Sequence, residues 1–133
     1  MTDLLMDTVA FVRYLEDDLP LPAAAAVEKV ERENESILLP QIALSEFVYI
    51  ALKGRLNLTN PLSAIGQVID QLKSSPIISI SSMPIDAWDV FVQLKVPELH
   101  DRMIAAEALY RNIPLISNDP AFDVAKDLKI IWK

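Results

Sequence analysis

Two aspartates stand directly after short apolar segments, near opposite ends of this 133-residue chain. Asp7 follows the apolar run at 4–6, and Asp119 follows the run at 115–116 after two intervening residues. If both runs are strands of one parallel sheet, both acids lie at its carboxyl edge, where open α/β sheets bind ligands. Each aspartate could instead cap a helix, because Asp7 precedes a helical pattern and Asp119 precedes Pro120, a residue favoured in a first helical turn.

Glu46 is a carboxylate within an otherwise apolar helical segment at 42–53. At about 100° per residue, apolar side chains cover nearly every side of this helix. A buried carboxylate is costly unless it is paired or binds a metal. The pairing alternative is a salt bridge to Lys53 or to an arginine from elsewhere in the chain. The same apolarity predicts that the helix packs on two partners, such as the sheet and a second subunit.

Asp101 begins a helical pattern that runs to Asn112. Ile104, Ala105 and Ala108 continue the stripe of Asp101, and small side chains there allow the helix to pack closely on a sheet. We therefore expect Asp101 to face the sheet. The alternative is a cap or a first-turn acid, whose interaction with the helix dipole is worth only about 0.3–1 kcal/mol.

These four acids could converge on one edge of the sheet and bind a divalent cation. Neighbouring carboxylates repel one another, and a divalent cation relieves that repulsion. Oxygen-only ligands favour Mg²⁺ or Mn²⁺ over Zn²⁺. Such a metal polarises a phosphoryl oxygen and lowers the pKa of a bound water, so the acids predict phosphate chemistry.

The elements that must position the acids alternate between short apolar runs and longer helical patterns. This alternation predicts an α/β fold with a central, mainly parallel sheet of five strands. The expected strands are 4–6, 36–39, 77–80, 115–116 and 128–132, and the expected helices are 8–16, 22–34, 42–53, 60–73, 84–94 and 101–112. No linker or internal repeat interrupts the pattern, so residues 1–133 are expected to form a single domain.

The composition narrows the chemistry further. With 12 Lys and Arg against 19 Asp and Glu, the net charge of -7 argues against nucleic-acid binding through a basic surface. The absence of cysteine excludes disulfides, zinc–thiolate sites and cysteine nucleophiles, and the single histidine excludes a histidine-rich metal site. A metal would then supply the positive charge that a phosphate needs. Because the chain lacks a basic leader and any run of about 18 apolar residues, we expect a cytoplasmic protein.

Four segments resemble the PIN-domain ribonucleases, namely LLMDT at 4–8, LSEF at 44–47, HDRMIAAEAL at 100–109 and ISNDPAF at 116–122. The resemblance implies a PIN-like three-layer α/β/α sandwich with an acidic pocket that holds Mg²⁺ or Mn²⁺. It also implies hydrolysis of RNA phosphodiester bonds by metal-activated water. By this resemblance, the catalytic, metal-binding residues would be Asp7, Glu46, Asp101 and Asp119. Thr8 and Ser117 fall where the family often has hydroxyl groups that orient those carboxylates.

A free-standing domain of this length is most similar to the VapC-type toxins of type II toxin–antitoxin pairs. This similarity implies a homodimer that is silenced by a cognate antitoxin, whose segment reaches into the acidic groove, often with an arginine. Val9 departs from the family, which commonly has Asn or Ser after the Asp-Thr pair. The departure supports an alternative, a PIN-like binding or assembly module that no longer cleaves. A metal-dependent phosphatase is disfavoured, because its Asp-x-Asp pattern would need an acid at position 9, where this chain has Val9. As for His100, the resemblance implies no essential role, because the family's histidine in this loop is generally not essential.

Overall fold

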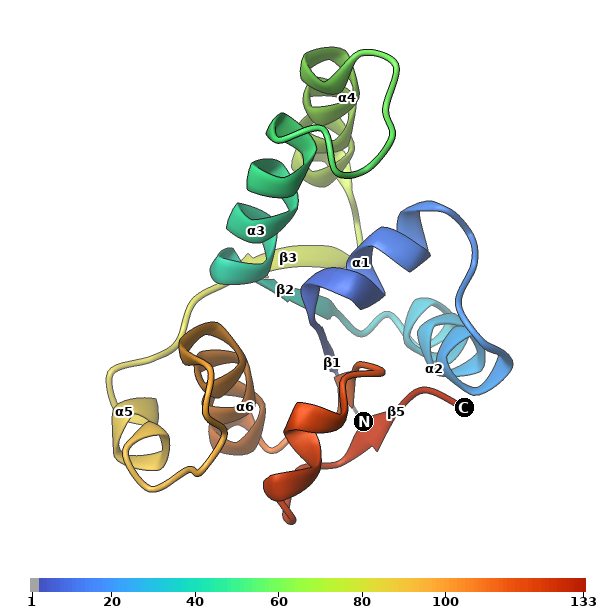
Figure 1. The fold of residues 1–133 in the computed structure, drawn as a ribbon. Helices are drawn as coiled ribbons and strands as arrows, with labels where there is room; N and C mark the ends of the chain where they lie inside the picture. Colours follow the sequence, from blue (N-terminus) through green and yellow to red (C-terminus); the bar gives the residue numbers. More distant parts are fainter. Residues whose placement is uncertain (1–2) are drawn as a thin grey trace.

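The computed structural model describes residues 3–133 and has a five-stranded sheet at its centre (Figure 1). The strands are β1 (Leu4–Met6), β2 (Ile37–Pro40), β3 (Ile78–Ser81), β4 (Leu115–Ile116) and β5 (Ile130–Ile131). Every pairing is parallel, in the order β3-β2-β1-β4-β5. The predicted α/β fold is confirmed, and the sheet is wholly rather than mainly parallel.

Helices cover the sheet on both sides. The α-helices among the described residues are α1 (Thr8–Leu15), α2 (Leu21–Arg32), α3 (Gln41–Leu52), α4 (Pro61–Ser74), α5 (Ala87–Phe91) and α6 (Leu99–Arg111), and a 3₁₀ helix, η1, spans Pro120–Val124. In Figure 1, α1 and α2 lie on one side of β1, and α5 and α6 lie on the other. A parallel sheet requires this arrangement, because each crossover between parallel strands carries helices over one of its faces.

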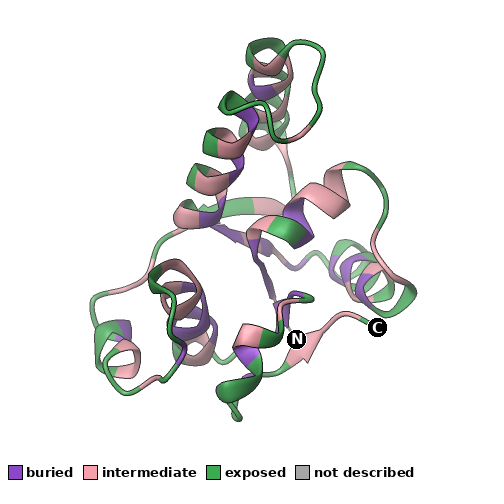
Figure 2. Ribbon diagram, in the orientation of Figure 1, coloured by how far each residue is buried: buried purple, intermediate pink, exposed green. Residues whose placement is uncertain are grey.

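The two central strands are buried. Leu5 and Met6 of β1 and Leu115 and Ile116 of β4 are fully removed from solvent. Figure 2 shows buried positions on β1 and β2 and on the inward sides of the helices, whereas the edge strands β3 and β5 are partly exposed. Burying one such side chain contributes roughly 1.5–3 kcal/mol. The carboxyl ends of β1 and β4 are therefore firmly held, and so are the residues that follow them.

The order of the strands changes direction beside β1. The chain runs from β1 outward to β2 and β3, and then returns to the other side of β1 to form β4 and β5. The connections after β1 and β4 consequently diverge, and α/β proteins bind ligands beyond the carboxyl ends of strands at such a point. Asp7 directly follows β1 and Asp119 follows β4 after two residues, as the sequence predicts.

Helix α3 differs from the sequence expectation. Only one of its faces is buried, through Ala43, Phe47 and Ala51. Tyr49 and Leu52 on the outward side are 57% and 55% exposed. Within the chain, α3 therefore buries one face and leaves apolar side chains exposed on the other, and packing on a second partner, such as a second subunit, stays a prediction.

Helix α6 begins two residues before the position that the sequence predicts. Its N-cap is Glu98, whose carboxylate accepts a hydrogen bond from the backbone N–H of Asp101 at 2.8 Å. Asp101 is thus a first-turn residue and not the head of the helix. Asn112 ends the helix in the left-handed conformation, with φ of 56°, which asparagine tolerates better than most residues. Two other elements are shorter than the sequence predicts: α5 spans Ala87–Phe91 within the expected 84–94, and β5 spans Ile130–Ile131 within the expected 128–132.

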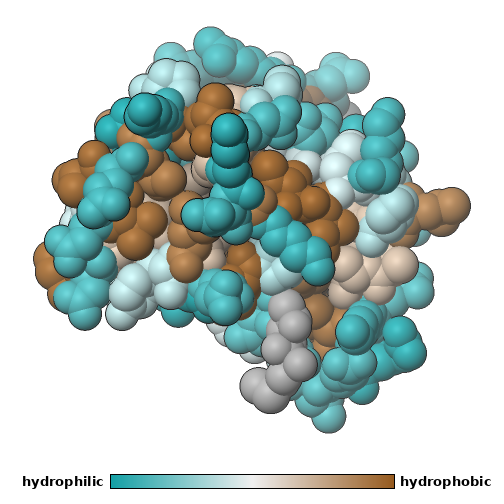
Figure 3. Space-filling view, turned by 90° about the horizontal axis from the view of Figure 1, so that it is seen from below, coloured by the Kyte–Doolittle hydropathy of each residue, from teal (hydrophilic) through white to brown (hydrophobic). Residues whose placement is uncertain are grey.

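Apolar side chains are also present at the surface. On the face seen in Figure 3, they form separate patches between polar side chains. The most exposed large apolar residues include Ile85 and Val92, which flank α5 and are 80% and 69% exposed. Within residues 3–133, none of the helices combines the length and the apolar character that crossing a bilayer would require.

Candidate active site

Asp7 is a buried carboxylate with a partner on each oxygen. It caps α1, because Oδ1 accepts a hydrogen bond from the N–H of Ala10 at 2.9 Å. Oδ2 accepts a hydrogen bond from the hydroxyl of Ser117 at 2.5 Å. Burial raises the pKa of Asp7, and the negative charges of Asp119 and Glu46 raise it further, while the two hydrogen bonds oppose this shift. The capping alternative is therefore correct for one oxygen but leaves the other facing β4.

Asp119 is joined to Asp7 through Ser117. Its backbone N–H donates to the Ser117 hydroxyl oxygen at 3.1 Å, and that hydroxyl donates in turn to Asp7. The Asp119 carboxylate caps η1 by accepting from the N–H of Ala121 at 2.9 Å. Ser117 is fully buried between the two acids. One hydroxyl thus links the residues that follow β1 and β4.

Replacing Ser117 with Ala is expected to destabilise the protein by about 1–3 kcal/mol at neutral pH, since a buried carboxylate loses a hydrogen bond. The Ser117 bond lowers the pKa of Asp7, so its removal raises that pKa. The loss of stability is therefore full at a pH where Asp7 is ionised. It declines as the pH falls and the carboxyl becomes protonated in both the folded and the unfolded protein. Chemical denaturation at neutral and acidic pH measures this difference. Ser63→Ala, at an exposed position, is the matched control, and an equal cost at both pH values would contradict the prediction.

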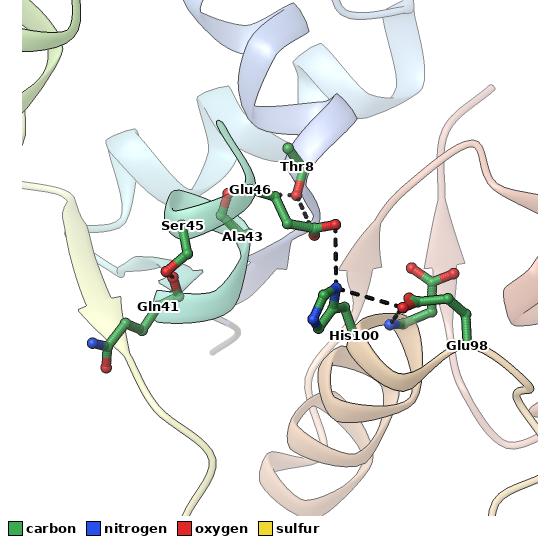
Figure 4. Close-up of polar contacts among 8 residues, drawn as sticks. Thr8, Gln41, Ala43, Ser45, Glu46, Glu98 and His100 are labelled. Carbon is green, nitrogen blue, oxygen red and sulfur yellow. Dashed lines mark hydrogen bonds and ion pairs between the residues drawn. The ribbon is translucent and has the colours of Figure 1, made fainter. Parts of the chain in front are cut away.

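Glu46 reaches from α3 toward the residues beside the other acids. Its Oε1 accepts a hydrogen bond from the Thr8 hydroxyl at 2.9 Å, and its Oε2 lies 3.6 Å from Nδ1 of His100 (Figure 4). The side chain is 36% exposed, so the expectation of a deeply buried carboxylate is not met. The alternative salt bridge to Lys53 is also wrong, because that ammonium group lies over the ring of Tyr49, 5.2 Å from its centroid.

Asp101 occupies the first turn of α6 and is half-buried. Burial, together with the negative charges of Asp119, Glu98, Glu46 and Asp7, raises its pKa from the ordinary 3.8 to about 6. Unlike Asp7, Asp101 has no hydrogen-bond donor within residues 3–133 that would stabilise its ionised carboxylate.

The structure brings the four acids predicted from the sequence into mutual electrostatic contact. Asp101 is affected by the charges of the other three, and Asp7 by those of Asp119 and Glu46. In the part of the chain from 3 to 133, no Lys or Arg forms an ion pair with any of them. Hydrogen bonds to Asp7 and Glu46, and the approach of His100 to Glu46, relieve part of this repulsion, and protonation or a cation from outside the chain would relieve more.

The chemistry of these donors fits a hard dication, because all four are carboxylates. Across the described residues, however, no three acidic or histidine side chains are arranged as a ready metal-binding group. Both oxygens of Asp7 already accept hydrogen bonds, and those of Glu46 face Thr8 and His100. The metal-binding role of the four acids, and the orienting role of Thr8 and Ser117, remain predictions.

A surface pocket of about 490 Å³ lies beside Glu46. Arg55 and His100 line it together with Tyr49 and Ile50. Arg55 therefore lies where a cationic side chain could contact a phosphate beside Glu46, the one of the four acids that lines this pocket. Arg13 and Arg102 are used elsewhere, since their guanidinium groups bind backbone carbonyls of Asp18 and Val96.

Sequence reasoning missed the contacts of Glu98 and His100, which lie three residues and one residue before Asp101. His100 lies between Glu98 and Glu46, and its Nδ1 is 3.4 Å and 3.6 Å from their carboxylate oxygens. The position of His100 next to Asp101 was the only available signal. The contact itself depends on how α3 packs on α6, and no single segment encodes that packing.

A family model described as a PIN domain matches residues 4–128. The fold is similar to that of VapBC2 from Rickettsia felis bound to a DNA fragment from its promoter, with a TM-score of 0.76 and 18% identity over 99% of this chain and 100% of that one. It is also similar to DNA-bound VapBC from Salmonella typhimurium, with a TM-score of 0.68 and 17% identity over 98% and 97% of the two chains.

FitAcB from Neisseria gonorrhoeae has a similar fold as well, with a TM-score of 0.65 and 20% identity over 96% of this chain and 95% of that one. At such identities, the likeness to these three structures establishes a shared fold alone. No curated protein sequence matches the chain.

Proposed function

The chain belongs to the PIN-domain family, and from this membership we propose that it is a metal-dependent endoribonuclease that hydrolyses RNA phosphodiester bonds. PIN domains are generally nucleases. The proposal treats residues 1–133 as one PIN-like domain. The observation that carries it is the gathering of four mutually repelling carboxylates at the sheet edge without a Lys or Arg ion-pair partner in residues 3–133.

The residues that would hold Mg²⁺ or Mn²⁺ are Asp7, Glu46, Asp101 and Asp119. When bound, the dication would polarise a phosphoryl oxygen and activate water for attack on phosphorus. Asp7 is oriented by Ser117, and Glu46 by the Thr8 hydroxyl. Such partners commonly decide how well carboxylates bind a metal. Asp101 must lose its proton to take part, and a dication would lower its raised pKa.

A substrate phosphate could also contact Arg55, which lines the pocket beside Glu46. The chain carries a net charge of -7, so its surface as a whole repels RNA. A bound dication would offset two of the negative charges where the acids gather and would give a phosphate a positive centre to bind. RNA would therefore bind at the four acids and Arg55, and a broad basic surface would not be needed.

We further propose that the protein is the toxin of a type II toxin–antitoxin pair and acts in the cytoplasm as a homodimer. The similar folds of the VapBC and FitAcB structures support this assignment. A cognate antitoxin would silence the enzyme by placing a cationic side chain, such as arginine, among the acids. The charge of the site favours such a partner, because an arginine forms bidentate pairs with carboxylates.

The alternative function is a PIN-like module that binds or assembles without cleavage. Val9 favours it, because this position beside the acids lacks the polar group that the family commonly has, and its side chain is 48% exposed. The exposed Val9 side chain could contact a partner, but it offers no donor to a phosphate.

One experiment separates the two functions. The purified chain is incubated with single-stranded RNA and Mg²⁺ or Mn²⁺, with and without a chelator. Cleavage that requires the metal and stops with the chelator supports the nuclease. Binding of Mn²⁺ in calorimetry without any cleavage would favour the inactive module, and chelator-resistant cleavage would contradict the metal-dependent mechanism. Inhibition by the product of a small neighbouring reading frame tests the toxin assignment separately.

A further inference from the structure

Glu98 and His100 form a chain of contacts between the start of α6 and Glu46 on α3 (Figure 4). One oxygen of Glu98 accepts the hydrogen bond from the N–H of Asp101, at 2.8 Å. The other oxygen lies 3.4 Å from Nδ1 of His100, and the same nitrogen lies 3.6 Å from Oε2 of Glu46. A single ring nitrogen therefore faces both carboxylates.

Glu46 is held from two sides by the neighbours of the other acids. Thr8, the residue after Asp7, donates to Oε1 of Glu46 at 2.9 Å. His100, the residue before Asp101, faces Oε2. Without such contacts, a side chain that is 36% exposed on a helix would populate several rotamers. The two contacts together favour the one rotamer that points toward the edge of the sheet where Asp7 and Asp101 lie.

Helix capping does not account for His100, because Glu98 already supplies the side-chain cap of α6. Contact with solvent does not explain the orientation of the His100 ring either, since the ring turns toward Glu46 on α3 and the side chain is only 38% exposed. The tautomer is an expectation of a positioning role, because the 3.4 Å and 3.6 Å distances from Nδ1 are those of ion-pair contacts and exceed ordinary hydrogen-bond lengths. A neutral imidazole can donate from Nδ1 to a carboxylate only if that nitrogen carries the proton.

We propose that His100 is a positioning residue that, held by Glu98, sets the direction in which Glu46 faces the acidic site. This inference rests on the proposed nuclease function. His100 links α6, which carries Asp101, to α3, which carries Glu46, so that the two carboxylates are oriented together. Partners of metal-binding side chains typically change metal affinity or activity by about 10–100-fold when they are replaced.

Three variants of His100 provide the test. Asn places an amide N–H near the position of Nδ1, Gln places it near Nε2, and Ala removes the donor. We expect His100→Ala and His100→Gln to lower kcat and to weaken Mn²⁺ binding in calorimetry by about 10–100-fold, while His100→Asn stays within about threefold of the unmodified protein. The KM for RNA should change by less than about twofold, because the residue acts through Glu46 and not on the substrate.

The tautomer of His100 gives a readout that is independent of activity. The chain has one histidine, so its ring nitrogens give a single set of NMR signals. In the neutral form of the ring, we expect the Nδ1–H tautomer to predominate. In a Glu46→Gln, Glu98→Gln variant, which lacks both carboxylates, the Nε2–H tautomer should become the major one.

The outcomes separate this inference from the function on which it rests. If the protein cleaves RNA with metal and His100→Ala keeps both kcat and Mn²⁺ affinity within about twofold, the positioning role is wrong and the nuclease stands. If no metal-dependent cleavage occurs, the nuclease proposal fails, and Mn²⁺ affinity and the tautomer still decide the role of His100. A predominant Nε2–H tautomer in the unmodified protein would overturn the positioning role.

Discussion

Asparagine in place of Asp101 is expected to abolish metal-dependent RNA cleavage and, at the same time, to stabilise the folded protein. Removal of a single oxyanion-hole donor typically costs about 10²–10³-fold in kcat, and we expect at least that loss for a carboxylate that would hold the metal. The gain in stability arises because Asp101 is ionised against burial and against the charges of Asp119, Glu98, Glu46 and Asp7. An amide of the same shape carries no charge and removes this repulsion.

The pH dependence of that stabilisation has a definite sign. The pKa of Asp101 is about 6 in the folded protein and 3.8 is its ordinary value, so the group is more easily ionised after unfolding. Below about pH 4 it is protonated in both states and costs nothing. The destabilisation grows as the pH rises through this window and is complete above about pH 6. Asp101→Asn should therefore match the unmodified protein at acidic pH and exceed its stability at neutral pH.

The size of the stabilisation is about 1 kcal/mol, because the carboxylate is only half-buried and solvent screens much of the repulsion. For a chain of this length, that corresponds to a rise in Tm of roughly 3–5 °C. Thermal unfolding with a chelator present measures it without interference from metal. Asp70→Asn, at an exposed position on α4, is the control and should change neither activity nor Tm. Retained cleavage in Asp101→Asn would remove Asp101 from the site, and a lower Tm at neutral pH would contradict the repulsion.

The parts of the site that the sequence predicts are those fixed by strand ends. Asp7 and Asp119 follow strands whose apolar residues leave little choice about burial, so their position at one edge follows from a parallel sheet. Ser117 lies between β4 and Asp119, and the structure places its hydroxyl between the two acids. Their catalytic role stays a prediction, because a strand end accommodates a cap as well as a ligand.

The parts that the sequence does not predict depend on contacts between helices. Apolar residues occur around the whole of α3, so periodicity cannot identify its outward face, and Tyr49 and Leu52 prove to be exposed. Glu98 is an uncommon choice of N-cap, since serine, threonine, aspartate and asparagine predominate there, and α6 was therefore placed two residues too late. The approach of His100 to Glu46 arises only when α6 packs beside α3.

The protein is expected to be more stable with Mg²⁺ or Mn²⁺ than with a chelator, because the cation would neutralise part of the charge of carboxylates that repel one another. At a free concentration of about 100 times Kd, binding to the folded state alone adds about 2.7 kcal/mol. In a chain of this length, that raises Tm by roughly 10 °C. Thermal unfolding across a series of metal concentrations measures the shift, and calorimetry at neutral pH gives the affinity directly.

The variants decide whether this stabilisation comes from the four acids. Asp101→Asn and Glu46→Gln each remove one carboxylate that the proposed site would use, so the metal-dependent rise in Tm should shrink in both and persist in Asp70→Asn. An undiminished rise in both site variants would place the metal elsewhere on a chain that carries 19 acidic residues. The absence of any rise with either metal would contradict the dication site. The four carboxylates would then carry their repulsion without compensation, and the non-cleaving module favoured by Val9 would become the better account of the protein.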